Sequence, residues 1–333
     1  MYIDFTTLYK VRYLRGLLCL FFVFWAELQA FSTDISRFAF KHFSELDNLS
    51  SKDIQSIYQD RDGFMWIATR NGLFQFDGYE GTVYKTNEAH SSLLTDNNVT
   101  CMTEDAAHRL WVGTSNGLNV LDKTTGTFRQ YGIDKVNFGS IAQLLVTRTG
   151  RLLVGADNGL YEYQSQSDDF LRIQGAETGG VYTGGSIKAL MEDAKGDIWI
   201  GTWSSGLYRQ EAATGRYYKY PQMNERNSAH VLFQDSRQRI WVGVWDGGLQ
   251  LLHDAYRPEH TTWTTFQYDE KRPTSLSDNL VYALAEDLET HTLWVGTRHA
   301  LSILPLHEQM DASAPFQHYY ADESDNTIAE SEV

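Results

Sequence analysis

The sequence has only two cysteines and five prolines among its 333 residues. Cys19 lies in an apolar segment near the N-terminus, so the rest of the chain contains Cys101 alone and cannot form an intrachain disulfide. A domain of this size without disulfides must be held together by the burial of apolar side chains. Cys101 stands between Thr100 and Met102 in a strand-like pattern, which favours a role in core packing.

Positive charge is also scarce. The chain has 28 Lys and Arg residues against 43 Asp and Glu residues, a formal net charge of −15. A surface of this charge repels phosphate backbones and anionic lipid head groups. We therefore expect no nucleic-acid partner and no direct binding to an anionic membrane surface.

The one prominent apolar run, Leu17 to Ala26, is short. A helix that crosses a membrane needs about 20 apolar residues. Because the run follows the basic residues Lys10, Arg12 and Arg15, it is typical of a signal peptide. We expect residues 1–30 to be removed after Ala30, which predicts a periplasmic protein. An uncleaved anchor is the alternative.

Aromatic residues and glycine are plentiful, at 14% and 26 residues, which suits short strands joined by tight turns. One segment recurs six times, with steps of 45, 42, 46, 42 and 53 residues between its central positions. Each copy contains four strand-like pieces, and this period predicts an all-β propeller of four-stranded blades. The central residue and its surroundings are Trp66 in GFMWIATRNGL, Trp111 in RLWVGTSNGL, Leu153 in RLLVGADNGL, Trp199 in DIWIGTWSSGL, Trp241 in RIWVGVWDGGL and Trp294 in TLWVGTRHAL.

The residues that recur in every copy have structural explanations. An Asp such as Asp60 closes the first strand, where its side chain can accept backbone N–H groups two residues on. Gly63 supplies the positive φ of that turn, and the Trp fills the wedge between adjacent sheets. Gly113 and its equivalents, two residues after the Trp, allow the neighbouring sheet to come close. Repetition in each blade therefore indicates packing elements and not a site.

The first copy, HFSELDNLSSKDIQSIYQDRDGFMWIATRNGLFQFDG, closely resembles the two-component regulator propeller repeat. The resemblance covers residues 38 to 328, with Leu153 in place of Trp, Thr147 in place of the turn Asp and Ala300 in place of Gly. It implies the periplasmic sensor region of a bacterial hybrid two-component receptor or of a propeller-linked diguanylate cyclase. In such receptors the propeller reads a ligand, often an oligosaccharide, and a membrane helix and an output domain follow. Neither occurs in this sequence, so the chain alone is not expected to be an enzyme.

The strand pattern indicates an incomplete ring of seven blades. Residues 31–44 contain an extra aromatic strand that could close the last blade, residues 45–323 hold six full repeats, and residues 324–333 look like the start of a seventh. Closure by an N-terminal strand protects the edges of a propeller. We therefore expect a fragment of a longer receptor. The alternative is a closed six-bladed ring with a spare N-terminal strand.

The loops between the second and third strands vary while their flanks repeat, as a binding surface on a fixed framework should. Trp203 and Trp245 occupy the same place in blades four and five, in loops one residue longer than those of blades one to three. Their indole faces could stack on sugar rings, or they could pack on neighbouring loops. Other loop side chains could hydrogen-bond a ligand or remain solvated: Arg70, Asn71, Asp157, Asn158, Asp246, Arg298 and His299.

The sequence thus predicts a ligand-sensing module for an oligosaccharide or another small polar molecule, with no cofactor and no metal. Membrane attachment would come only from segments downstream, and a homodimer is possible in the full receptor. Two alternatives stay open. A propeller glycan lyase or glycosidase could pair two carboxylates such as Asp157 and Asp246 across the channel, and a flat polar face would suit a protein-binding scaffold.

Overall fold

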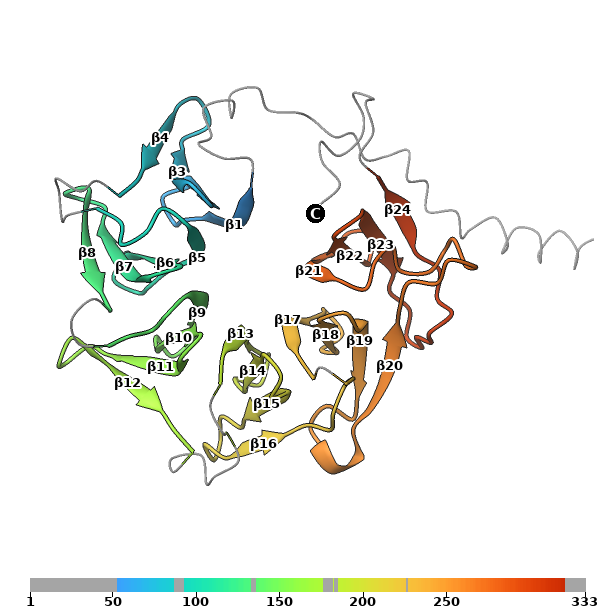
Figure 1. Cartoon of the computed structure of the whole chain (residues 1–333). Coiled ribbons are helices and arrows are strands. Elements are labelled where there is room, and N and C mark those ends of the chain that lie inside the picture. Colours follow the sequence, from blue (N-terminus) through green and yellow to red (C-terminus); the bar gives the residue numbers. More distant parts are fainter. Residues whose placement is uncertain are drawn as a thin grey trace, which may run out of the picture. The chain divides into compact units, whose positions relative to one another are not determined.

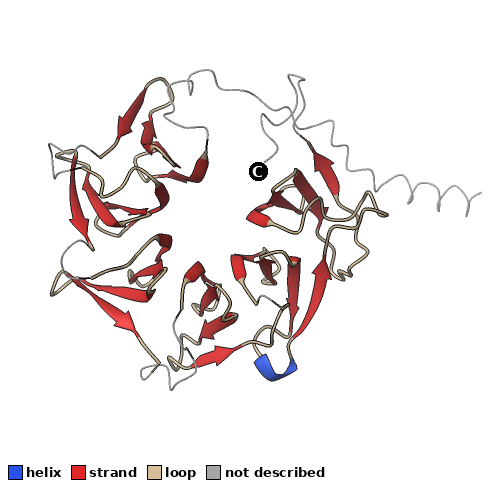
Figure 2. Ribbon diagram, in the orientation of Figure 1, coloured by secondary structure: helices blue, strands red, loops and turns tan. Residues whose placement is uncertain are grey.

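The computed structural model describes residues 53–86, 93–132, 136–175, 182, 185–225 and 227–320. These residues form 24 strands in six four-stranded antiparallel sheets, with one short 3-10 helix, η3 (Pro258–His260). Figure 1 shows the sheets set in a ring in chain order, and Figure 2 shows that strands make up nearly all the regular structure. The predicted all-β propeller with six blades is confirmed. The predicted signal peptide, N-terminal strand and start of a seventh blade lie outside the described residues.

Each blade consists of four strands that pair in sequence order, with the first strand innermost and the fourth outermost (Figure 1). Blades one to three contain β1 (Ile54–Gln59), β2 (Met65–Thr69), β3 (Gly72–Phe76), β4 (Gly81–Tyr84); β5 (Val99–Glu104), β6 (Leu110–Thr114), β7 (Gly117–Asp122), β8 (Thr127–Tyr131); and β9 (Ile141–Val146), β10 (Leu152–Ala156), β11 (Gly159–Gln164), β12 (Asp169–Ile173). Blades four to six contain β13 (Ile187–Glu192), β14 (Ile198–Thr202), β15 (Leu207–Gln210), β16 (Tyr217–Lys219); β17 (Ala229–Gln234), β18 (Ile240–Val244), β19 (Gly248–His253), β20 (Thr262–Phe266); and β21 (Val281–Asp287), β22 (Thr292–Thr297), β23 (Leu301–Pro305), β24 (Gln317–Tyr319).

This connectivity separates two rims. The loops between second and third strands share one end of the blades with the crossings from one blade to the next, and we call this end the upper rim. The turns between first and second strands and between third and fourth strands share the opposite end, the lower rim. Innermost strands of successive blades contact one another from β1 through β5, β9, β13 and β17 to β21.

Four tryptophans, which we call the framework tryptophans, are buried between successive blades. Trp66, Trp111, Trp199 and Trp241 are at most 1% exposed. The Trp111 ring of blade two lies 5.0 Å from the Tyr163 ring of blade three, between centroids. Apolar burial between sheets therefore joins the blades, as the lack of disulfides requires.

Each framework tryptophan is also hydrogen-bonded to the aspartate that closes the first strand of its own blade. The Trp66 indole donates to Asp60 Oδ2 at 2.8 Å, while Asp60 Oδ1 accepts the backbone N–H of Asp62 and Phe64. The turn role predicted for the aspartate is confirmed, and its bond to the indole adds a second role. The other pairs are Asp105–Trp111, Asp193–Trp199 and Asp235–Trp241, at 2.7 to 2.9 Å.

Blade three lacks both members of this pair. Thr147 replaces the aspartate and Leu153 replaces the tryptophan. Thr147 Oγ1 accepts the turn N–H of Arg151 at 3.0 Å and shares a hydrogen bond with Thr149 Oγ1, also at 3.0 Å. A buried carboxylate needs donors for its lone pairs, so losing the indole N–H removes a reason to keep the acid. The two departures are therefore a single coupled change.

The glycine two residues after the central position lies against the next blade, as predicted. A Cβ built on Gly155 of blade three would lie 2.6 Å from Ile187 Cγ2 of blade four. Such contacts are shorter than van der Waals distance, so a side chain there would push the sheets apart. The same close approach occurs at Gly113, Gly201 and Gly243.

We expect Gly155→Ala to lower the free energy of unfolding by about 1–3 kcal/mol, because the added methyl overpacks the interface between blades three and four. Urea denaturation followed by circular dichroism would measure the change. In an Ile187→Ala background the same substitution should have a smaller effect, since the nearest clashing atom, Cγ2, is gone while Leu190 Cδ1 remains 3.2 Å away. An undiminished effect in that background would show that the clash with Ile187 is not the cause.

Candidate functional site

The upper rim carries an aromatic cluster formed by Trp203, His230 and Trp245. The ring centroids of Trp203 and Trp245 are 5.3 Å apart in an edge-to-face arrangement. The His230 ring lies between blades four and five, 4.9 Å from Trp245 and 6.0 Å from Trp203. Trp203 is 38% exposed, whereas His230 and Trp245 are half-buried. The Trp203 indole is thus partly exposed and packs against the rings of His230 and Trp245.

The two tryptophans take equivalent positions because their loops are anchored alike. The N–H of Trp203 donates to Ser186 O at 2.8 Å, and the N–H of Trp245 donates to Ser228 O at 3.0 Å. The extra loop residue requires a left-handed backbone one position later, with φ of 64° at Ser204 and 55° at Asp246. The two indoles therefore take the same place on the upper rim in neighbouring blades.

His230 and Lys188 come from innermost strands at positions where the strand register shifts. Lys188 lies in the shift between Ile187 and Ala189, and His230 lies in the corresponding shift between Ala229 and Val231. A bulge turns the extra side chain away from the ladder. The equivalent residues in the other four blades are Gln55, Thr100, Ala142 and Tyr282.

A charged pair borders the aromatic cluster. Lys188 Nζ lies 3.1 Å from Asp157 Oδ1 of blade three and 6.0 Å from the centroid of the Trp203 ring. The Ser186 hydroxyl donates to the same Asp157 oxygen at 2.8 Å. Burial alone would raise the pKa of Asp157, but these two hydrogen bonds outweigh it and lower the pKa. The site therefore places a carboxylate and an ammonium beside an apolar ring face.

His230 is neutral in this environment. Burial lowers its pKa to about 4, and the positive charge of Lys188 adds to the shift. At a pH between 6.5, the ordinary pKa, and about 4, the imidazole is protonated in the unfolded chain but not in the folded chain. The free energy of unfolding therefore decreases as the pH falls through this range. The imidazole thus presents one donor and one acceptor nitrogen at neutral pH.

We expect Lys188→Met to raise the pKa of His230, because the substitution removes a neighbouring positive charge. The pKa should remain below the ordinary value, since burial is the larger cause and persists. An NMR titration of the imidazole C–H signal would follow the change, with exposed Lys271→Met as the matched control. An unchanged titration in Lys188→Met would contradict this electrostatic account.

Comparisons with known proteins agree with the repeat. The family model described as two component regulator propeller matches residues 48–71, 93–116 and 182–204. These three segments, in blades one, two and four, match the two-component regulator propeller repeat. A histidine kinase of Formosa agariphila is 38% identical to this chain over 60 residues, which are 18% of this chain and 4% of that protein.

Solved structures similar to this chain include the extracellular domains of two putative hybrid two component systems of B. thetaiotaomicron. Their TM-scores are 0.69 and 0.67 at 20% and 22% identity, over 85% and 86% of this chain and 37% and 36% of theirs. The chain therefore spans little more than a third of those ectodomains. Virginiamycin B lyase from Staphylococcus aureus has a TM-score of 0.60 at 11% identity, over 82% of this chain and 86% of the lyase. At these identities the likeness concerns the fold.

The structure brings together three of the residues predicted for the site, Asp157, Trp203 and Trp245. Arg298 and His299 of blade six lie together on Asp278, at 3.1 and 2.9 Å from its Oδ2. Arg70 of blade one lies 3.9 Å from Asp53. Of the remaining predicted residues, Asn71 donates its N–H to Thr69 in the same loop, and the Asn158 side chain donates to Asn137 O in the crossing from blade two to blade three. Asp246 occupies the left-handed position after Trp245.

Sequence reasoning missed Lys188 and His230. Each stands second in an innermost strand, where strand alternation gives no sign of a bulge. The same register position in the six blades holds six different residue types, and this variability was the one available signal.

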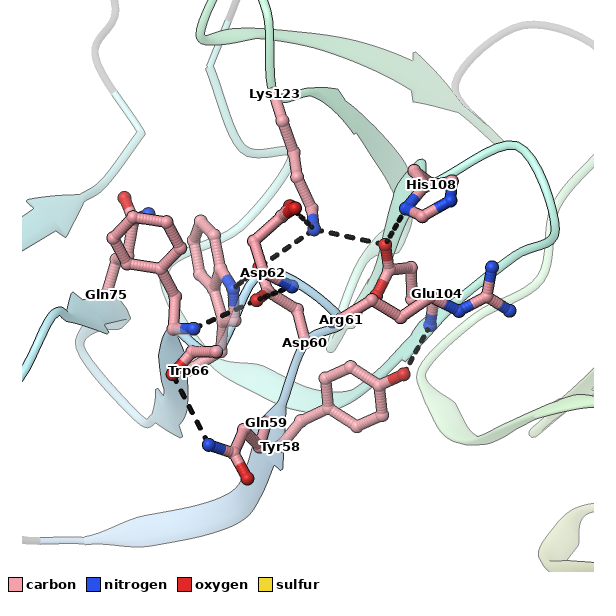
Figure 3. A network of polar contacts seen from close by, with 12 residues as sticks. Tyr58, Gln59, Asp60, Arg61, Asp62, Trp66, Gln75, Glu104, His108 and Lys123 are labelled. Atoms are coloured by element: carbon pink, nitrogen blue, oxygen red, sulfur yellow. Dashed lines mark hydrogen bonds and ion pairs between the residues drawn. The ribbon is translucent and has the colours of Figure 1, made fainter.

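A second polar cluster lies on the lower rim, between blades one and two (Figure 3). Lys123 Nζ contacts Asp60 Oδ2 at 2.8 Å, Asp62 Oδ2 at 3.0 Å and Glu104 Oε1 at 3.1 Å. Burial alone would lower the pKa of Lys123, but the hydrogen bonds that its ammonium donates to these carboxylates outweigh burial and raise the pKa. Lys123 is a single cation among three carboxylates, and the side chains of Asp60 and Glu104 are fully buried, which indicates a clamp between blades.

One hydrogen bond of this clamp recurs at other interfaces between blades. Glu104 Oε2 accepts the N–H of Arg61 of the preceding blade at 2.9 Å. The same strand-end position accepts a backbone N–H from the preceding blade through Glu192, Gln234 and Glu286, at 2.7, 2.7 and 2.6 Å. A feature that recurs at interface after interface supports a structural role.

None of the described segments is a helix of the length and apolarity that a bilayer crossing requires.

Proposed function

We propose that this propeller is the extracytoplasmic ligand-sensing part of a bacterial signal-transduction receptor, and that it reads an oligosaccharide or a similar small polar ligand. The observation that carries the proposal is the juxtaposition of Trp203, His230 and Trp245 with the Lys188–Asp157 pair. A sugar ring combines an apolar C–H face with hydroxyls at its edge. The indole can stack on the face, while ammonium, carboxylate and imidazole bond the hydroxyls.

Recruitment of these groups from three blades supports recognition of a ligand longer than one ring. Asp157 comes from blade three, Lys188 and Trp203 from blade four, and His230 and Trp245 from blade five. The similarity to extracellular domains of hybrid two component systems supports the sensing role. The relation to a membrane and an output domain is part of the proposal, since the chain spans only part of those ectodomains.

We expect Trp203→Ala and Trp245→Ala each to weaken oligosaccharide binding by at least about tenfold, which is about 1.4 kcal/mol. Calorimetric titration with ligands selected from an oligosaccharide panel would measure the affinity. Tyr79→Ala, which removes an 87% exposed aromatic ring from blade one, is the matched control and should bind as the wild type does. Equal affinity in both tryptophan variants and the control would reject the site.

A lyase is the second candidate, because a neutral imidazole beside an ammonium could take a proton from a bound substrate. The fold is shared with virginiamycin B lyase, and His230 with Lys188 supplies both groups here. Incubating the protein with each ligand that binds and analysing the products by mass spectrometry separates the two functions. Turnover that is lost in His230→Ala would support the lyase, whereas binding without turnover supports the sensor.

A further inference from the structure

At four of the five described interfaces between successive blades, the space beside the turn aspartate on the lower rim is occupied by a large polar side chain. Lys123 of blade two bonds Asp60 of blade one, and the Tyr256 hydroxyl of blade five donates to Asp193 of blade four at 3.0 Å. The other two occupants belong to the same turn as their aspartate: Arg109 bonds Asp105 and Arg239 bonds Asp235.

The interface between blades three and four differs at three positions together. Thr147 replaces the turn aspartate and Leu153 replaces the framework tryptophan. Ala212 takes the place that Lys123 has in blade two, since each stands six residues after the glycine of its Gly-Leu pair. Leu153 and Ala212 are much smaller than their counterparts. Arg151, which stands where blades two and five have Arg109 and Arg239, bonds Glu162 of its own blade instead of a turn aspartate, so the space beside Thr147 is less filled than at the other four interfaces.

A hollow with a volume of about 580 Å³ lies at this point. The turns β9–β10, β13–β14 and β15–β16 form its walls, and the lining includes Thr147, Thr149, Arg151, Gln210, Glu211 and Ala212. Sites for small ligands are typically about 300–1,000 Å³. The hollow is on the lower rim, at the end of the blades opposite the aromatic cluster, and is therefore separate from the site described above.

The walls are held in place by bonds that cross the interface. The N–H of Arg148 donates to Glu192 Oε2 at 2.7 Å, and Arg148 Nε lies 3.3 Å from Glu192 Oε1. The same guanidinium donates to the carbonyl oxygens of Asp193 and Ala194. A cavity with preorganised walls binds a ligand at a lower entropic cost than one that must be ordered first.

Each cation that lines the hollow already has a partner within the chain. Arg151 makes a two-point contact with Glu162, at 2.8 and 2.9 Å, and Arg148 is paired with Glu192. Lys195 lies over the Tyr256 ring, with Nζ 3.2 Å from the ring centroid. An anionic ligand would therefore have to break an ion pair or this cation–π contact. Hydroxyl, amide and carboxylate groups of Thr149, Gln210 and Glu211 offer donors and acceptors to neutral hydroxyls.

We propose that this hollow between blades three and four is a second binding site, which takes the ring of a neutral polyhydroxylated molecule. The ring occupies the volume that Lys123 or Tyr256 fills at other interfaces, and its hydroxyls bond the polar lining. This inference is independent of the proposed function of the upper rim.

The test uses the Trp203→Ala/Trp245→Ala protein, so that binding on the upper rim does not contribute. Saturation-transfer NMR with D-glucose, D-galactose and D-xylose as probes, and D-glucuronate as the charged analogue, measures binding. We expect saturable binding of at least one neutral probe and weaker binding of glucuronate. No saturable signal with any neutral probe, or tighter binding of glucuronate, would overturn the proposal.

Two variants test whether the probe binds in the hollow. Ala212→Phe and Ala212→Lys fill it from an exposed position, so the fold should be retained, and each should weaken the neutral probe by at least about tenfold. Ala213→Lys adds the same charge at the next exposed residue, outside the lining, and should leave binding unchanged. Binding that persists in both Ala212 variants would overturn the assignment even if the upper rim still binds its ligand in the wild type.

Discussion

Lys123→Met is expected to lower the free energy of unfolding by about 3–5 kcal/mol, the range seen when one partner of a buried ion pair is removed. The side chains of Asp60 and Glu104 are fully buried, and Lys123 is the cation that both contact. Without it, two carboxylates remain close together in the interface between blades one and two (Figure 3). Methionine preserves most of the apolar stem, so the effect reports the charge.

Equilibrium unfolding in urea would measure this change, with exposed Lys271→Met as the control for removing a positive charge from the surface. The double variant Glu104→Gln/Lys123→Met should recover part of the loss, because one of the two unpaired charges is then gone. If Lys123→Met were as stable as the control, the clamp would contribute nothing to the joining of the blades.

The second large effect concerns the coupling between turn aspartate and framework tryptophan. We expect Trp199→Leu and Asp193→Thr each to destabilise blade four, and the double variant to be more stable than the sum of the two losses by about 1–3 kcal/mol. The double variant recreates the Thr–Leu combination that blade three already has. Trp199→Leu alone leaves the Asp193 carboxylate, which is 1% exposed, without the indole donor at 2.8 Å.

A double-mutant cycle from thermal or urea unfolding gives the coupling free energy directly. Leu153→Val in blade three is a suitable control, since Thr147 has no bond to that side chain to lose. Additive losses in blade four would mean that the hydrogen bond is incidental and that the paired departures in blade three have separate origins.

Much of the fold follows from the sequence because each blade repeats the same local physics. Trp66 and its equivalents predict burial between sheets, and Gly155 predicts close approach, since both residue types are demanded by geometry that recurs. The pairing of Asp60 with the Trp66 indole was not predicted, although the two residues keep a constant spacing in four blades. The joint replacement of both residues in blade three, by Thr147 and Leu153, was the sequence signal that the aspartate and the tryptophan are paired.

The candidate site was harder to predict. Trp203 and Trp245 could be found because their loops are longer than the others and carry indoles beyond the framework. His230 and Lys188 could not, because a bulge moves them out of the strand alternation on which the sequence argument depends. Lys123 lies 63 residues from Asp60, and no local pattern connects such distant partners.

The bulge near the start of each innermost strand has a consequence for how propellers of this kind diversify. Gln55, Thr100, Ala142, Lys188, His230 and Tyr282 share one backbone position yet have little chemistry in common. Because the bulged residue takes no place in the ladder, its side chain can be exchanged without loss of a strand pair. Point substitutions at these positions can therefore change the side chains around the central channel one blade at a time. New specificities can evolve in this way while the architecture stays the same.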